Sequence, residues 1–360
     1  MDDNKKMELQ HPGNALAELL EEMGMTQREL SYRTGVTEKH ISTVVKGNKD
    51  ISTAFAKKLE YALSKPMNYW IDLQANYDNQ KMNLEKNLGI DDEEKKVFKR
   101  LSDIIDYLEK TELIYAASND TDKIVEVRKF MGVSNLKYIS KIQYNAAYRA
   151  QVNNNVNVDP YVLYAWKRIC ESCANRIQLD AKLDIDKLKK RLYEIKNLMF
   201  SNLSDINKEL TSIFKECGIA FMIVPHFKGA PVQGFISRLD NGKVMLCLTL
   251  RQKRADKFWF TLFHEIGHLI NGDVDNSFVD FSSVKSDNEE QADLFAGNIL
   301  LDSEAYRLFL MNGDYTLKSI KDFSKQQNVK PYIVIGRLQN DGELEWNEYS
   351  LEMVYYEWVA

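Results

Sequence analysis

The chain has 360 residues, of which 44% are hydrophobic and 28% charged, and its formal net charge at pH 7 is −5. This length suits two or three domains with proper cores, and the net acidity argues against wholesale affinity for nucleic acid or membranes while leaving a local basic face open. The N-terminus has no apolar signal region, and no stretch approaches the roughly 18 apolar residues of a membrane span, so we expect a cytoplasmic protein without a membrane partner.

Residues 14–65 carry four or five short helical patterns separated by glycines and polar caps. The second of them begins with a capping box, in which Thr26 is the N-cap and Glu29 follows three residues later. Gly35 then provides a tight turn, and Thr37 caps the next helix. Two short helices joined by a glycine turn predict a helix-turn-helix.

Charge supports this interpretation locally. Residues 26–65 hold eight Lys/Arg and four Asp/Glu, a net charge of +4, whereas the chain as a whole is acidic. In a helix-turn-helix, basic side chains meet phosphates and the second helix presents polar side chains to base edges in the major groove. The candidate DNA-binding residues are Gln27, Arg28, Thr37, Lys39, His40, Ser42, Thr43 and Lys46. The alternative is a small protein-interaction module with an ordinary solvated face.

Three features give this region a family resemblance. They are His11-Pro-Gly13, Thr26-Gln27 and the run Asn68-Tyr-Trp-Ile-Asp-Leu-Gln-Ala-Asn-Tyr-Asp78. Residues 8–80 thereby resemble HigA-type antitoxins of the wider Xre-like helix-turn-helix class. The resemblance implies a double-stranded DNA operator with an inverted repeat, binding as a homodimer, and a toxin as one conceivable partner.

Residues 80–200 have helical spacing throughout, with breaks at Gly132, at residues 153–155 and before Pro160. Pro160 opens a helix whose aromatic residues we expect in the core: Tyr161, Tyr164 and Trp166. This helical connecting region would set the distance between the two ends of the chain and could relay a signal between them.

The four cysteines are too few and too scattered for a disulfide framework. Cys170 and Cys173 form a C-x-x-C pair, but a zinc ribbon needs a second pair that the chain lacks. We therefore expect buried, reduced thiols rather than a metal or redox site.

Three apolar runs predict strands at residues 219–224, 232–236 and 243–250. The turn sequence at 239–242 makes a hairpin of the last two. The edge of such a hairpin can hold an extended peptide by strand addition.

A clean H-E-x-x-H sequence follows the strands, from His264 through Glu265 to His268. Residues four apart lie on one face of a helix, so both imidazoles can reach one zinc ion at roughly 2.0–2.1 Å. Glu265 can then act as general base toward a water at the metal. The plain alternative is a polar helix with a chance histidine pair.

A third ligand is available on a second predicted helix, residues 289–296. Glu289 and Glu290 are neighbours, so both cannot face the metal. We choose Glu289 because Asp293 lies one helical turn later on the same face. Asp293 could accept the spare N–H of a ligating histidine, as outer carboxylates commonly do around zinc.

The run Leu248-Thr-Leu-Arg-Gln-Lys-Arg254, the segment from Phe258 to His268 and the pattern Glu289-x-x-Ala-Asp-x-Phe-Ala296 resemble the ImmA/IrrE family of zinc metallopeptidases. The Glu-x-x-x-Asp spacing is also similar to that of gluzincins in general. The resemblance covers about residues 200–310. It implies His264, His268 and Glu289 as zinc ligands and Glu265 as catalytic base, in agreement with the assignment from the residues alone.

These patterns predict a multidomain, mostly α chain with an α+β C-terminal domain. A five-helix helix-turn-helix domain (1–79) is followed by the helical connecting region (80–200) and a gluzincin-like zinc metallopeptidase domain with a small β-sheet (201–345). Beyond residue 300, segments 317–323 and 334–338 suggest further helices. An aromatic, acidic tail (346–360) either docks on the core or covers the cleft.

We expect a DNA-binding transcriptional regulator that carries a zinc-dependent endopeptidase. The resemblance implies a repressor-type protein substrate, often Xre-like, in a stress, mobile-element or toxin–antitoxin response. The alternative is a HigA-like antitoxin and autorepressor whose metallopeptidase-like domain binds a partner without proteolysis. A housekeeping peptidase that does not use its helix-turn-helix on DNA is a third possibility. The intact ligand set and Glu265 favour the enzyme, because a binding domain needs no catalytic base.

Overall fold

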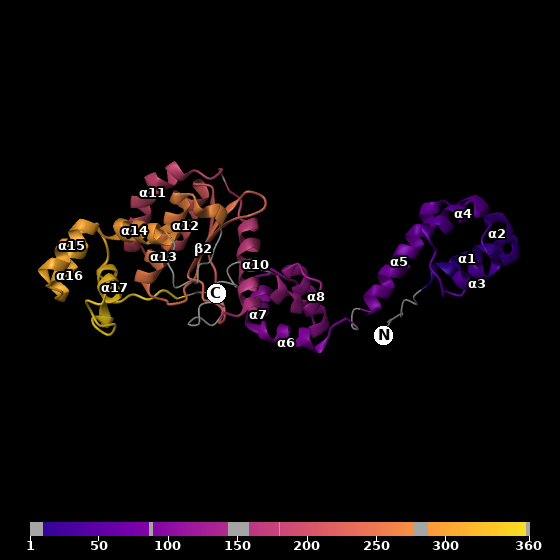
Figure 1. The fold of residues 1–360 in the computed structure, drawn as a ribbon, viewed down its shortest axis with the longest axis horizontal. Coiled ribbons are helices and arrows are strands. Elements are labelled where there is room, and N and C mark those ends of the chain that lie inside the picture. Colours follow the sequence, from indigo (N-terminus) through magenta and orange to yellow (C-terminus); the bar gives the residue numbers. More distant parts are fainter. Residues whose placement is uncertain (1–9, 86–88, 143–157, 180, 277–286, 358–360) are drawn as a thin grey trace. The chain divides into compact units, whose positions relative to one another are not determined.

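The computed structural model describes residues 10–85, 89–142, 158–179, 181–276 and 287–357 (Figure 1). The chain divides into two compact units, Met1–Asp91 and Asp92–Ala360. The helix break expected at residues 153–155 lies outside the described residues. No helix in the described part is long and apolar enough to cross a membrane.

In its described residues the first unit contains five helices: α1 (Pro12–Glu22), α2 (Gln27–Thr34), α3 (Glu38–Val45), α4 (Thr53–Leu63) and α5 (Met67–Glu85). Thr26 Oγ1 accepts a hydrogen bond from the Glu29 N–H at 3.1 Å, which begins α2 as the capping box predicts. Gly35 ends α2 in the left-handed conformation, with φ of 64°, so that α3 can start within a few residues. The predicted helix-turn-helix is therefore confirmed.

One core holds these five helices together. Its completely buried side chains come from every helix: Leu16, Leu30, Ile41, Val44, Ala56, Leu59 and Trp70. The sequence did not suggest how α1 begins. The buried His11 is its N-cap, and His11 Nδ1 accepts a hydrogen bond from the Gly13 N–H at 2.9 Å.

The second unit begins with a series of helices, continues with the three strands of a small sheet and ends with further helices. Its first part contains α6 (Asp92–Arg100), α7 (Ser102–Lys110), α8 (Asp120–Met131), η2 (Leu136–Lys141), α10 (Pro160–Arg176), α11 (Ile185–Asn197), η3 (Leu198–Phe200) and α12 (Leu203–Glu216). The strands are β1 (Ile219–Ile223), β2 (Gly234–Arg238) and β3 (Val244–Leu248). After them come α13 (Ala255–Asn271), η4 (Asp273–Asn276), α14 (Asp287–Leu300), α15 (Ser303–Asn312), α16 (Leu317–Gln326), α17 (Pro331–Asp341) and η5 (Ser350–Glu352).

The three strands form one sheet with the order β1-β3-β2. β1 runs parallel to β3, with Ile219 opposite Val244, and β2 runs antiparallel to it, with Ile236 opposite Leu246. The predicted hairpin is therefore β2–β3, with β2 starting two residues later than expected. Every residue of β3 is buried, as in a strand that is covered on both faces.

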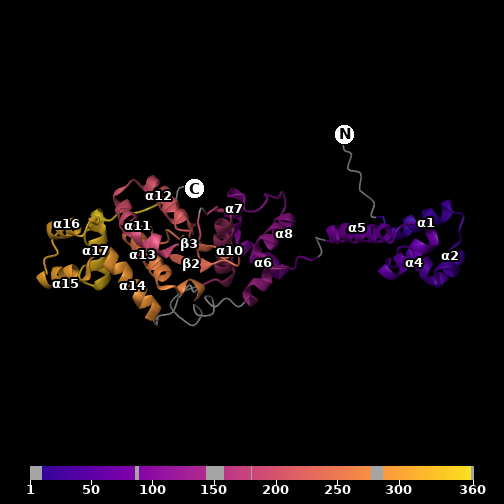
Figure 2. The same ribbon diagram turned by 90° about the horizontal axis from the view of Figure 1, so that it is seen from above.

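Alternate residues of the strands serve two different cores, because successive side chains point to opposite faces of a sheet. Leu246 and Leu248 belong to the core that contains α12 and α13, whereas Met245 and Cys247 belong to the core that contains α7 and α10. In Figure 2, β2 and β3 lie between α13 on one side and α10 on the other.

Among the described helices between residues 92 and 177, α10 packs on β1 and β3, and α7 and α8 pack on α10, so these helices form part of the second unit. The buried Trp166 of α10 shows this, since its ring lies edge-on against Phe235 of β2 at 5.9 Å between centroids. We had expected these residues to connect two domains. The structure groups the described part of them with the C-terminal domain, in one unit that begins at Asp92, and the apolar face of α10 covers the sheet.

The chain end docks on the start of α13. The Tyr356 N–H donates to the Lys253 carbonyl at 2.6 Å, the Ala255 N–H donates to Val354, and the buried Trp259 Nε1–H donates to the Tyr356 hydroxyl at 2.9 Å. Of the two roles left open for the tail, the described residues, which reach 357, show docking on the core. α15, which the sequence analysis did not predict, starts at an Asp302 N-cap.

Candidate metal centre

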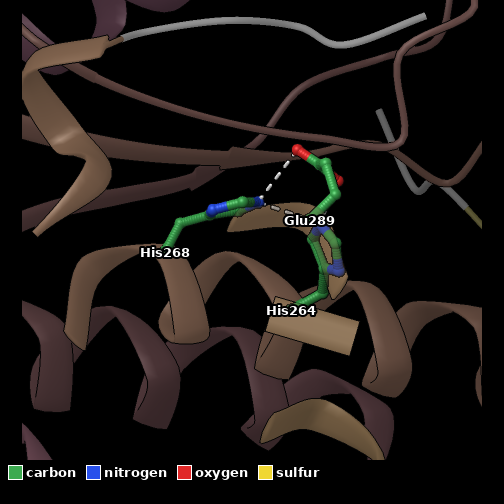
Figure 3. Close-up of side chains that lie close together, drawn as sticks. All are labelled: His264, His268 and Glu289. Carbon is green, nitrogen blue, oxygen red and sulfur yellow. Dashed lines mark hydrogen bonds and ion pairs between the residues drawn. The ribbon is translucent and has the colours of Figure 1, made fainter. Parts of the chain in front are cut away.

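His264 and His268 lie one turn apart on α13, and their side chains converge near Glu289 (Figure 3). Their Nε2 atoms are 3.1 Å apart, and both side chains are largely buried. The flanking residues of α13 explain the position, because Leu262, Phe263 and Ile266 are completely buried in the core and fix the rotation of the helix. The imidazoles therefore face a defined point beside the helix.

Glu289, in the first turn of α14, faces the same point. Its Oε2 lies 3.2 Å from His264 Nε2, and its Oε1 lies 3.3 Å from His268 Nε2. One potential ligand atom from each of the three residues lies within 4.8 Å of the others, a geometry that could hold a metal ion. The neighbouring Glu290 is exposed instead.

A glycine lets α14 approach α13 this closely. A Cβ at Gly267 would lie 3.1 Å from the Ala292 Cα and 3.2 Å from the Phe295 ring. A side chain at position 267 would push the two helices apart and carry Glu289 away from the histidines. The small residue inside H-E-x-x-H is thus needed for packing rather than for backbone conformation.

Each imidazole has an outer carboxylate partner. His264 Nδ1 lies 2.9 Å from Asp293 Oδ1, and His268 Nδ1 lies 3.2 Å from Asp273 Oδ2. Asn288 in turn donates to Asp273 Oδ1 at 2.8 Å. Such partners fix the ring orientation and leave each Nε2 free to bind a metal. Asp293 is the partner that the sequence predicts. Asp273 is not predicted, and its only signal in the sequence is a carboxylate just after Gly272 at the end of α13.

The charges of the three residues suit a cation. Burial alone would raise the pKa of Glu289, but hydrogen bonds to the two histidines outweigh it and lower the pKa to about 2. Burial alone would lower the pKa of His264, yet Asp293 and Glu289 raise it to about 10. Both shifts mean that positive charge is strongly favoured where the three side chains meet. Two imidazole nitrogens and one carboxylate are also a donor set that zinc binds in proteins.

Glu265 lies next to this point and is almost fully buried. Burial raises its pKa to about 7, although the nearby charges of His264 and His268 oppose the shift. A Cβ at Gly234, the first residue of the edge strand β2, would collide with the Glu265 carboxylate. The glycine therefore brings the start of β2 into direct contact with this side chain.

The candidate DNA-binding residues occupy one region of the first unit, on α2 and α3. Arg28, Thr37, Lys39 and Lys46 are exposed, whereas Gln27, Ser42 and Thr43 are half-buried. Some of them also have local partners. The Arg28 Nε–H donates to the Tyr32 hydroxyl at 3.0 Å, and the Thr43 hydroxyl donates to the Lys39 carbonyl at 2.7 Å.

His40 differs from its neighbours on α3. Its ring packs edge-on against Phe55 of α4 at 5.2 Å between centroids, and its Nε2 is buried. Its Nδ1 lies 3.2 Å from the Lys49 ammonium. The imidazole is therefore turned toward the domain, and it can present only its Nδ1 edge to a ligand.

Two parts of the chain match known families. Residues 16–70 match the helix-turn-helix family, and residues 236–331 match a peptidase family described as the IrrE N-terminal-like domain. The chain thus carries an Xre-like helix-turn-helix domain and an IrrE-type metallopeptidase-family domain, which confirms both resemblances. No curated protein matches the chain.

Two solved structures are similar to about a quarter of the chain. One is an addiction module antidote protein of the HigA family from Coxiella burnetii, with 26% identity, 27% of this chain and 95% of that chain covered, and a TM-score of 0.21. The other is described as an antidote protein of a plasmid maintenance system from Nostoc punctiforme PCC 73102. It has 24% identity, 23% of this chain and 97% of that chain covered, and a TM-score of 0.20.

Proposed function

We propose that this chain is a DNA-binding transcriptional regulator that carries a zinc-dependent endopeptidase. The observation that carries the proposal is the arrangement of four side chains on two helices. His264, His268 and Glu289 converge on one point, and the buried Glu265 lies beside it. A partner-binding surface would not require a carboxylate held in that place.

His264, His268 and Glu289 would hold the zinc ion, with Asp293 and Asp273 keeping the two imidazoles in orientation. Bound zinc supplies Lewis-acid polarisation of a peptide carbonyl and of water. Glu265 takes the proton from the attacking water and passes it to the leaving amine.

The edge strand β2 offers a place for the substrate. It pairs with β3 on one side only in the described sheet, and its first residue, Gly234, touches Glu265. An extended segment that adds to this edge would present its backbone carbonyl beside the catalytic base. The substrate would therefore be cut in an extended, locally unfolded segment.

The helix-turn-helix supplies the second half of the proposal. Its exposed Arg28, Lys39 and Lys46 would meet DNA phosphates, and α3 would enter the major groove. We further propose that a homodimer binds an inverted-repeat operator in the cytoplasm, and that the substrate is a repressor-type protein, such as an Xre-like one.

The test joins metal content with proteolysis. Purified wild type should contain about one zinc ion per chain, and His264→Ala should contain almost none. Purified wild type and Glu265→Gln should both contain zinc. Cells that express one or the other are then compared by mass spectrometry of newly formed protein N-termini. New termini should arise with the wild type alone. Identical termini in both samples, with zinc retained in both, would contradict the proposed mechanism.

A second candidate function is a HigA-like antitoxin and autorepressor whose C-terminal domain binds a partner without cutting it. The similarity of residues 8–80 to HigA-type antitoxins favours it. This candidate predicts operator binding and a stable toxin complex that Glu265→Gln leaves unchanged. Retention of both by a chain that binds no zinc would select it over the peptidase.

A further inference from the structure

A cavity of about 640 Å³ lies between α13, α14, α15 and α17, next to the metal centre but separate from its ligands. Its volume falls within the range of roughly 300–1,000 Å³ that small-molecule sites occupy, and it is far larger than one amino-acid side chain requires. Nothing in the proposed peptidase chemistry needs a space of this size there.

Much of the cavity wall is apolar. Phe260 from α13, Leu301 after α14, Leu310 from α15 and Ile333 from α17 contribute to it, and Leu294 of α14 forms part of its rim with 64% of its surface exposed. An apolar wall with a few polar groups is the usual composition of a site for a small organic molecule.

The carboxylates that line the cavity are all engaged. Asp256 accepts two hydrogen bonds from the Arg254 guanidinium, at 2.9 and 3.0 Å. Asp341 accepts from the Arg337 Nε–H at 2.8 Å and from the Tyr306 hydroxyl at 2.9 Å. Asp293 is held by His264 of the metal centre.

The cations that line it differ in this respect. Arg337 is paired with Asp341, and Arg307 is paired with Glu304 at 2.7 Å. Lys257, by contrast, has no carboxylate oxygen within 4.0 Å in the described part of the chain. Its ammonium lies 3.5 Å from the Asn340 amide oxygen and 5.5 Å from the centre of the Trp346 ring.

Lys257 is also half-buried. Burial lowers the pKa of this ammonium, and the nearby Arg254 adds to the effect, while Asp256 opposes it. A half-buried cation without a close counter-ion gains more from an anionic ligand than an exposed lysine does, because the local dielectric is lower. The cavity thus combines apolar walls with an ammonium group that has no carboxylate oxygen within 4.0 Å in the described residues.

We propose that this cavity binds a small organic monoanion with an apolar frame, and that its negative group pairs with Lys257. Asn340, which also lines the cavity and lies 3.5 Å from the Lys257 ammonium, carries an amide N–H that could donate a further hydrogen bond to that group. The apolar frame would lie along Phe260, Leu301 and Ile333. This binding site goes beyond the proposed peptidase function and does not depend on it.

The position of the cavity would bring such a ligand close to the metal centre. Phe260 lines the cavity, and its ring lies 6.2 Å from the His264 ring between centroids. Asp293 also borders the cavity and orients the same imidazole. Ligand and metal would therefore share two neighbouring side chains.

Two fluorescent probes with the same aromatic frame test the proposal on the zinc-loaded full chain. 8-Anilino-1-naphthalenesulfonate carries one negative charge, and N-phenyl-1-naphthylamine is neutral. Lys257→Met should weaken binding of the sulfonate by about tenfold and change binding of the neutral probe by less than about twofold, since one charge-assisted contact is lost. Lys325→Met, at an exposed site on α16, is the matched control and should change neither.

A second pair of variants tests the location. Asn298 is exposed on α14 and lines the cavity, whereas Gln291 is exposed on the same helix and does not line it. Asn298→Trp should fill the mouth of the cavity and weaken both probes by about tenfold, and Gln291→Trp should weaken neither. The proposal is overturned if the wild type does not bind the sulfonate, or if Asn298→Trp and Lys257→Met bind it as their controls do.

Discussion

The helix pairs α2–α3 and α13–α14 each carry the polar residues of one proposed activity. On the first pair these residues face the solvent, whereas on the second pair they face the protein interior. On α2 and α3 the charged side chains are exposed, and the polar groups that need partners find them within a few residues, as Thr26 does at the Glu29 N–H. On α13 and α14 the polar groups of the candidate metal centre are turned inward, and each imidazole depends on a carboxylate from another element.

This difference teaches how far each site depends on the fold. An exposed contact residue can be replaced at small cost to stability, because water takes the place of its partner. When a buried polar group loses its partner, its full desolvation free energy destabilises the folded state. Substitutions at the metal centre on α13–α14 should therefore have large effects that are not additive. Substitutions of exposed residues on α2–α3 should have small effects on stability that are additive.

The largest expected effect is that of Glu289→Ala. Loss of one of three ligands should lower zinc affinity by more than the roughly 10–100-fold that an outer partner contributes. Glu290→Ala is the matched control, since its carboxylate is one residue away and exposed. It should bind zinc within about twofold of the wild type. Competition with a chromophoric chelator measures both, and the opposite ranking would assign the ligand to Glu290.

Asp273→Asn comes next. It keeps the size of the side chain but removes the negative charge that faces His268 Nδ1. We expect zinc affinity to fall by about 10–100-fold, as for other outer carboxylates. Asp293→Asn should have a similar effect through His264. Asp287→Asn, also in the first turn of α14 but exposed, serves as the control. Unchanged affinity in Asp273→Asn would mean that this contact does not support the metal.

These partners also show what the sequence could and could not predict. The spacing of His264 and His268 is a property of one helix, so periodicity alone predicts their common face. Glu289 was chosen over Glu290 through the position of Asp293, which again is local to a helix. Asp273 was missed because its position depends on how Gly272, with φ of 82°, turns the chain at the end of α13.

The fold shows the same division. The boundaries of α2 and α3 followed from Thr26, Gly35 and Thr37, whose effects reach only a few residues. The apolar faces of the helices between residues 92 and 177 were visible, but not the surface that they cover. For α10 that surface includes β1 and β3 of the sheet, which lie much later in the chain, so local pattern could not identify it.

A smaller effect is expected on the exposed pair. Lys46→Ala should reduce the dependence of DNA affinity on salt concentration by about one unit of slope on logarithmic axes, as expected when one phosphate contact is lost. Lys58→Ala, which is exposed on α4 outside the helix-turn-helix pair, is the control. Fluorescence anisotropy with mixed-sequence duplex DNA measures the slope in the full chain. Equal slopes for Lys46→Ala and the wild type would remove Lys46 from the interface.

The smallest expected effect concerns His11, the one buried imidazole in the first unit that serves as a helix cap. Burial lowers its pKa from 6.5, and Lys81 adds to the shift, although Asp50 and Asp78 oppose it. The neutral ring is required because Nδ1 must accept from the Gly13 N–H, and a protonated Nδ1 would have no lone pair to offer.

The direction of the pH effect follows from linkage. The unfolded chain takes up a proton below about pH 6.5, whereas the folded state resists it, so stability is complete above that value and falls as the pH decreases. The slope cannot exceed about 1.4 kcal/mol per pH unit for one proton. His11→Asn keeps an acceptor at the cap but cannot titrate, so it should flatten this slope even if it lowers stability overall.

Amide hydrogen exchange of α1 in the full chain, corrected for the intrinsic effect of pH, measures the slope between pH 7.5 and 5.5. His40 also has a pKa that burial lowers, with a further contribution from Lys49, so some pH dependence should survive in His11→Asn and disappear when His40→Asn is added. A slope that is the same in the wild type and in His11→Asn would show that the cap does not depend on the neutral ring. In that case the first unit would accept a protonated His11 without loss of stability. Of the two helix pairs compared, only α13–α14 would then depend on buried polar partners.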